Sequence, residues 1–193
     1  MFPVRSGRIL RRLAAASVAV LAICGSALGL QRLDGNFHTV VPGELYRSAQ
    51  PSPDDIGLYA RDYGIRTVLN LRGAAPGAPW YDAEKAAADR LGLTLIDFPM
   101  SARHELKPGR AKALVALLKS ARKPILVHCN AGSDRSGLVS VIFSSQVAGI
   151  DEKDAEAQLS LFYGHIGIPL LSPTFAMDRS WEKLEPLFGI TGS

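Results

Sequence analysis

The feature that most constrains the fold is a short loop between two apolar segments near residue 130. Residues 124–127 (PILV) form a short, partly β-branched run, which predicts a buried strand. Residues 138–143 (LVSVIF) predict the buried start of a helix. Such a strand, tight loop and helix form a cradle for an anion. The N–H groups of the loop converge on one point, and the N-terminus of the helix adds partial positive charge.

The loop carries a nucleophile and a cation at close spacing, Cys129 and Arg135. Cys129 is expected to ionise readily, because the loop N–H groups, the helix dipole and the Arg135 guanidinium all stabilise its thiolate. Arg135 offers a planar pair of donors that matches two oxygens of a tetrahedral oxyanion. Together these residues suit attack on a bound phosphate through a phosphocysteine intermediate.

The segment from His128 to Gly137 (HCNAGSDRSG) resembles the His-Cys-x5-Arg-Ser/Thr-Gly signature of the cysteine-based protein tyrosine and dual-specificity phosphatases. Residues 43–48 (GELYRS) and 64–72 (GIRTVLNLR) resemble the atypical plant-and-fungal branch of that superfamily and its bacterial relatives. The resemblance covers about residues 36–148. It implies a phosphatase that needs no metal and no cofactor and acts on a phosphorylated substrate.

Most of the residues expected to bind the substrate lie in the same loop. The hydroxyl of Ser136 is also placed to hydrogen-bond the thiolate, and His128 is expected to support the loop. Arg47 and Arg72 each end a predicted strand, where they either face the phosphate pocket or are ordinary surface charges. The candidate substrate-binding residues are Asn130, Ala131, Gly132, Ser133, Ser136 and Arg72.

The sequence leaves several candidates for the proton donor. In the phosphatases that the chain resembles, an Asp on a loop before the last helix–strand pair usually supplies the proton. Here that loop is 101–105 (SARHE) and contains no Asp. Asp134 is the first candidate, because it lies in the anion-binding loop, an arrangement similar to the myotubularin branch. Its alternative role is to bond backbone amides or Arg135. The other candidate donors are Asp97, His104 and Glu105.

The rest of the chain predicts an α/β fold with a mostly parallel central sheet flanked by helices. Short apolar strands alternate with helical segments from residue 36 onward, and such alternation is typical of parallel sheets. Ser52 and Gly64 mark the start and the end of one helix. Further helices are expected after Asp151, with Leu161 inside, and over 174–187.

The N-terminal region predicts a basic and hydrophobic leader over residues 1–30. Residues 13–30 include no charged residue, and their length of 18 residues is near the shortest that can span a membrane. Four arginines precede them, so the remainder is expected on the exported side. One interpretation is a single-pass anchor at the periplasmic face of the inner membrane. The other is a signal peptide whose cleavage leaves a periplasmic or secreted protein. A linker, 31–35, then leads to a catalytic domain over 36–193.

The net charge of +4 gives no support for a nucleic-acid partner. Arg5, Arg8, Arg11 and Arg12 precede the first acidic residue, and removing these four from 22 basic residues leaves 18, against 18 acidic ones. No basic tract with interleaved aromatic residues follows. Besides a phosphatase of phosphoproteins or small esters, the sequence leaves open a phosphatase of lipid or inositol phosphates and a phosphate-binding protein without turnover.

Overall fold

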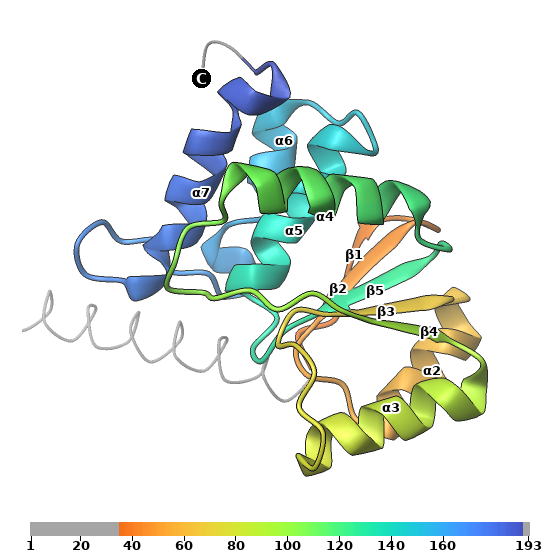
Figure 1. The fold of residues 1–193 in the computed structure, drawn as a ribbon. Helices are drawn as coiled ribbons and strands as arrows, with labels where there is room; N and C mark the ends of the chain where they lie inside the picture. The colour runs from red at the N-terminus through yellow and green to blue at the C-terminus, as the bar shows by residue number, and fades with distance from the viewer. Residues whose placement is uncertain (1–34, 191–193) are drawn as a thin grey trace, which may run out of the picture. The chain divides into compact units, whose positions relative to one another are not determined.

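The computed structural model describes residues 35–190 and shows a five-stranded sheet with helices on both faces (Figure 1). The strand order is β1-β2-β5-β3-β4. Only β1 and β2 pair antiparallel, and the other neighbours are parallel. The predicted α/β fold with a mostly parallel sheet is therefore confirmed. The strands are β1 (His38–Val41), β2 (Leu45–Ser48), β3 (Thr67–Asn70), β4 (Thr94–Asp97) and β5 (Ile125–His128).

Strand β5 lies at the centre of the sheet, between β2 and β3. All four of its residues are buried, in agreement with the strand predicted for this segment. The ends of both neighbours are level with its own end, because Ser48 and Asn70 each pair with His128. Residues that follow β2, β3 and β5 therefore meet at one edge of the sheet, where open α/β sheets bind their ligands.

Two helices cover one face of the sheet and four cover the other (Figure 1). Helices α2 and α3 lie together below the sheet in this view, and α4 to α7 lie above it. Short 3₁₀ turns occupy Leu161–Tyr163, Pro173–Phe175 and Pro186–Phe188. The α-helices are α2 (Pro53–Tyr63), α3 (Pro79–Leu91), α4 (Pro108–Ser120), α5 (Asp134–Gln146), α6 (Glu152–Glu156) and α7 (Ala176–Leu184).

Helix α5 is the centre of the main core. Nine consecutive residues, 136–144, are buried, so the helix is enclosed on all sides. It packs against β2, β5, α4, α6 and α7. This burial fixes its N-terminus against the end of β5 and so fixes the loop between them.

The local signals that bound α2 act as expected. Ser52 and Asp55 form a capping box, in which the Ser52 hydroxyl accepts from the Asp55 N–H and Asp55 accepts from the Ser52 N–H. The helix ends at Gly64, whose φ of 68° lies in the left-handed region that favours glycine. Both predicted boundaries are confirmed.

The C-terminal region differs from the prediction. Helix α6 has only five residues, and Leu161, which was expected inside a helix, is 56% exposed in a 3₁₀ turn. The helix expected over 174–187 is divided into a 3₁₀ turn, α7 and a second 3₁₀ turn. Pro186 opens that last turn, since a proline has no N–H to continue the α-helical hydrogen bonds.

The predicted leader, residues 1–30, and most of the linker lie outside the described residues. Within residues 35–190, none of the helices has the length and apolarity needed to cross a membrane.

Candidate active site

The loop between β5 and α5 encloses the thiol of Cys129, which is 2% exposed. We call residues 129–135 the catalytic loop. The Gly132 N–H donates to the Cys129 sulfur at 3.3 Å, and the Ser136 hydroxyl lies 3.7 Å from it. Helix α5 begins at Asp134, so its positive end is directed at the same loop. The thiol thus sits among groups that stabilise a thiolate.

Glycine is required at position 132 for two reasons. Its φ is 73°, which L side chains rarely adopt. A Cβ atom there would also lie 2.6 Å from the Ala49 nitrogen and 2.7 Å from the Ser48 carbonyl carbon. The catalytic loop therefore packs directly on the backbone that leaves β2, and this contact sets its curvature.

The guanidinium of Arg135 lies across the edge of the sheet. Its Nη1 donates to the carbonyl oxygens of Leu71, at 3.2 Å, and Met100, at 3.3 Å. These acceptors follow β3 and β4, so the carboxyl ends of two strands hold the side chain in place. Its other donors make no hydrogen bond to the described residues and remain available to an anion.

Arg47 is neither in the pocket nor on the surface, so both expectations for this residue are wrong. It is fully buried, and its guanidinium donates to the carbonyl oxygens of Gly132, at 2.9 Å, and Ser133, at 2.8 Å. It also donates to the Gln158 carbonyl at 2.7 Å and lies 4.4 Å from the centre of the Tyr163 ring. Burial lowers the pKa of Arg47 to about 10. The side chain supports the catalytic loop from within the protein.

Asp134 lies at the first position of α5 and contacts a buried histidine. Its Oδ1 accepts from His165 Nδ1 at 2.7 Å, and His165 Nε2 donates to Asp178 at 2.9 Å. With both ring nitrogens donating, His165 carries a positive charge. Burial lowers the pKa of His165, but the hydrogen bonds to the two carboxylates outweigh burial and raise it to about 9. No pattern in the sequence predicts a role for His165 in the site.

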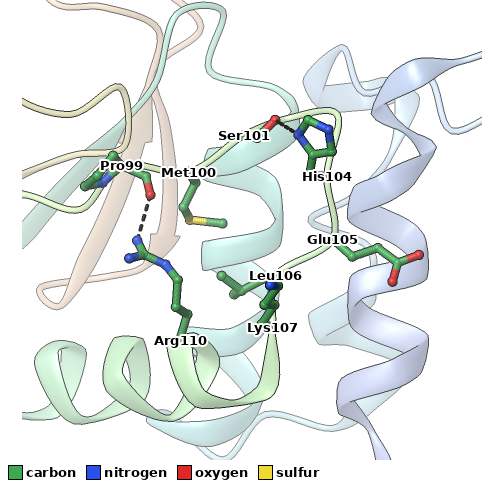
Figure 2. A pocket seen from close by; sticks show the side chains of 8 residues that line it. All are labelled: Pro99, Met100, Ser101, His104, Glu105, Leu106, Lys107 and Arg110. Atoms are coloured by element: carbon green, nitrogen blue, oxygen red, sulfur yellow. Dashed lines mark hydrogen bonds between the residues drawn. The ribbon is translucent and has the colours of Figure 1, made fainter.

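The segment after β4, whose Met100 carbonyl accepts from Arg135, lines a pocket of about 260 Å³ together with the start of α4 (Figure 2). Arg110 of α4 donates to the Pro99 carbonyl across this pocket, and His104 bonds Ser101 on its upper side in this view. The pocket is lined by Pro99, Met100, Ser101, His104, Glu105, Leu106, Lys107 and Arg110.

Two alternative proton donors have their carboxylates engaged. Asp97 accepts from Asn70 at 2.7 Å and from the Tyr81 hydroxyl at 2.6 Å. Glu105 is paired with two cations of α7, Arg179 and Lys183. The hydrogen bond from Lys183 is the main reason that the pKa of Glu105 is lowered.

A polar chain connects the base of the catalytic loop to Arg72. His128 Nε2 lies 2.8 Å from Glu84, and both side chains are fully buried. Glu84 accepts from Gln50 at 2.7 Å, and the Gln50 amide oxygen accepts from Arg72 at 2.7 Å. The Arg72 guanidinium stacks on Trp80, 3.5 Å from its ring centre. His128 thus supports the loop, as expected, through a carboxylate that sequence reasoning missed.

Within the described part of the chain, no group of three or more His, Cys, Asp or Glu side chains is placed to hold a metal ion. The catalytic loop instead presents N–H groups, a helix N-terminus and Arg135, all of which bind an anion.

A buried cysteine in an anion-binding loop, with an arginine on the helix that follows, defines the cysteine-dependent phosphatases. Residues 28–159 match the model of the tyrosine phosphatase family. The match covers more than half of the chain, and the chain belongs to this family. It is a cysteine-dependent phosphatase of the protein tyrosine and dual-specificity superfamily.

Solved structures show the same fold. TpbA of P. aeruginosa has a TM-score of 0.61 and 21% identity, over 81% of this chain and 92% of its own. A complex of TpbA with pTyr has a TM-score of 0.56 and 21% identity, over 68% and 76%. The core catalytic domain of the PP-IP phosphatase SIW14 from S. cerevisiae, in complex with citrate, has a TM-score of 0.56 and 21% identity, over 81% and 94%. No curated protein matches the chain by sequence.

Proposed function

We propose that the protein hydrolyses phosphomonoesters in two steps through a phosphocysteine on Cys129. The thiolate attacks phosphorus, an S–P bond forms, and the bond from phosphorus to the leaving oxygen breaks. Water then attacks phosphorus, the S–P bond breaks, and inorganic phosphate leaves with the thiolate restored. The observation that carries this proposal is the buried sulfur at the N-terminus of α5, bonded to the Gly132 N–H beside Arg135.

The phosphate is proposed to bind the loop N–H groups of Asn130, Ala131, Gly132 and Ser133 together with Arg135. The Ser136 hydroxyl, close to the sulfur, is proposed to stabilise the thiolate as it leaves phosphorus in the second step. These groups become more effective as charge accumulates on the transferring phosphoryl group.

The proposed proton donor to the leaving oxygen is Asp134. One of its oxygens accepts from the positively charged His165, so Asp134 is ionised before the substrate binds. It is proposed to take up a proton from solvent when the negatively charged phosphate binds beside it, and to pass that proton to the leaving oxygen. Asp97 and Glu105 are engaged in hydrogen bonds and ion pairs elsewhere. The carboxylate of Asp134 is also engaged, by His165, and it is preferred because it lies within the catalytic loop itself.

The change Asp134→Asn tests this role. A phenolate leaves readily without a proton and an alkoxide does not, so turnover of an alkyl phosphate is expected to fall about tenfold more than turnover of an aryl phosphate. The measurement is kcat on both substrates, with His165→Asn as the control for lost support of the loop. Equal losses on the two substrates would assign Asp134 to support of the loop alone.

Activity itself is tested with p-nitrophenyl phosphate and the full-length protein. The proposal expects turnover that vanadate inhibits and that Cys129→Ser abolishes. If neither the wild type nor Cys129→Ser shows turnover and both still bind phosphate, the second candidate is established, a phosphate-binding protein without turnover.

The proposed substrates are phosphoproteins or small phosphate esters rather than highly charged inositol phosphates. Asn130, Ala131 and Ser133, the loop residues nearest Cys129, carry no charge, and a polyanion would need more cations around it. A comparison of kcat/KM over phosphotyrosine, phosphoserine, inositol and lipid phosphates tests this choice. Preference for an inositol or lipid phosphate would overturn it.

We also propose that the enzyme works outside the cytosol, attached by residues 13–30. The support is the uncharged length of that segment and the four arginines before it. Protease added to intact cells with a permeabilised outer membrane would digest the catalytic domain if it faces the periplasm. Full protection would contradict this location.

A further inference from the structure

Arg72 lies at the rim of the catalytic loop. Its neighbour Leu71 donates its N–H to the His128 carbonyl at 3.0 Å and accepts from Arg135 at 3.2 Å. The backbone that carries Arg72 is thus bonded to the residue before Cys129 and to the phosphate-binding arginine. The Arg72 guanidinium therefore extends from the residue directly after Leu71, whose carbonyl holds the Arg135 guanidinium.

Two contacts hold the partly buried Arg72 side chain in place. Trp80, at the start of α3, stacks on the guanidinium at 3.5 Å, and Gln50 accepts a hydrogen bond from Nη1 at 2.7 Å. Gln50 is itself fixed, because its N–H donates to the Asn130 carbonyl and its amide donates to the buried Glu84. An arginine held in this way loses little side-chain entropy when it binds a ligand.

The charge of Arg72 is not neutralised by an ion pair within residues 35–190, and the same holds for Arg135. Burial lowers the pKa of Arg72, and repulsion from Arg135 lowers it further, which agrees with two cations facing the same space. Arg72 uses Nη1 for Gln50, and its Nη2 and Nε make no hydrogen bond to the described residues. These donors are available to an anion.

We propose that Arg72, stacked on Trp80 and held by Gln50, forms a second anion-binding site beside the phosphate site. It takes a carboxylate or phosphoryl group that lies next to the scissile phosphate of the substrate. Gln50 and Glu84 act as positioning residues that keep the guanidinium at the rim. This inference rests on the proposed function, since it specifies which phosphomonoesters the same pocket prefers.

The kinetic test compares phenyl phosphate with 2-, 3- and 4-carboxyphenyl phosphate in the wild type and in Arg72→Met. Each substrate is compared with itself in the two proteins, so differences in leaving group cancel. A charge-assisted hydrogen bond supports about a tenfold or larger effect. In Arg72→Met, kcat/KM is expected to fall about tenfold more on the best carboxylate isomer than on phenyl phosphate. The additional fall is expected to come from a higher KM.

Arg90→Met is the matched control, because Arg90 is an exposed arginine at the far end of the helix that carries Trp80. It is expected to leave kcat/KM unchanged on all four substrates. In Gln50→Met, kcat/KM on the carboxylate isomer is also expected to fall more than on phenyl phosphate, but by a smaller factor. Arg72 remains in this variant and has lost only the hydrogen bond that holds it. Equal losses on phenyl phosphate and on every carboxylate isomer in Arg72→Met would overturn the proposal.

A binding measurement does not depend on turnover. The chain has two tryptophans, and the other one, Trp181, is fully buried in the core, so anion binding at Arg72 is reported by Trp80 fluorescence. In Cys129→Ser, pyrophosphate is expected to change this emission at lower concentration than inorganic phosphate does. The preference should disappear in Arg72→Met. If Arg72→Met still prefers pyrophosphate, the second site is overturned. If the wild type hydrolyses no substrate but the preference depends on Arg72 as expected, only the proposed hydrolysis is overturned.

Discussion

Two arginines, Arg47 on β2 and Arg72 after β3, flank the central strand β5 and have opposite roles. Arg47 is fully buried and donates to the carbonyl oxygens of three residues, two of them in the catalytic loop. Arg72 is half-buried, bonds one amide oxygen and stacks on an indole ring. Both terminal nitrogens of Arg47 donate hydrogen bonds within the protein, whereas Arg72 has a terminal nitrogen left for a ligand.

The difference shows that the position of an arginine at a strand end does not decide its role. On the β2 side, the catalytic loop and the segment after α6 supply carbonyl groups to Arg47, so the guanidinium becomes part of the core. On the β3 side, the chain turns out toward Trp80 and leaves the guanidinium at the rim. The number of backbone acceptors within reach decides whether such an arginine supports the loop or binds an anion.

The largest effect is expected from Arg47→Met. The change leaves buried carbonyl groups without donors, which should lower the free energy of unfolding by about 4 kcal/mol. Urea denaturation measures this loss. The matched variant Arg72→Met should lose less than about 1 kcal/mol, since the arginine is half-exposed and forms no ion pair with the described residues. Equal losses of unfolding free energy in the two variants would contradict the different roles of Arg47 and Arg72.

A smaller effect is expected from Glu84→Gln, on the β3 side. His128 then loses a charged acceptor in a fully buried site, which should reduce the free energy of unfolding by about 2 kcal/mol. The change also loosens Gln50 and so Arg72. A variant as stable as the wild type would show that the rim is not supported through this buried pair.

The smallest effect depends on pH and concerns His165, on the β2 side. The pKa of His165 is raised to about 9 in the folded protein, above its ordinary value of 6.5. Its stabilisation is therefore complete below about pH 6.5 and is lost as the pH rises through about 9. The difference in unfolding free energy between wild type and His165→Asn should shrink by about 1 kcal/mol from about pH 8 to about pH 9.5. A difference that stays constant would show that His165 is not charged.

The local parts of this molecule could be predicted from the sequence. The apolar run of β5, the catalytic loop and the buried start of α5 follow one another directly, so short-range patterns suffice. The Ser52 cap and the Gly64 stop are equally local. The parallel sheet follows from the alternation of such elements.

The contacts that hold the catalytic loop in place could not be predicted, because they join segments that are far apart in the sequence. Arg47 bonds a residue 111 positions later, and His165 meets Asp134 across 31 positions through an irregular loop. Glu84 is different, since its position three residues after Tyr81 and four before Ala88 places it on the buried stripe of α3. A charged residue on such a stripe signals a buried partner, and this signal was available in the sequence.

In the proposed mechanism, Cys129 becomes covalently phosphorylated during turnover. The most direct test is rapid acid quenching of the full-length protein during turnover of an aryl phosphate, followed by mass spectrometry of the peptide that contains Cys129. We expect this peptide to gain the mass of one phosphoryl group, and the corresponding Cys129→Ser peptide to gain none at the same quench time. Steady turnover by the wild type without any phosphoryl group on Cys129 would contradict the account.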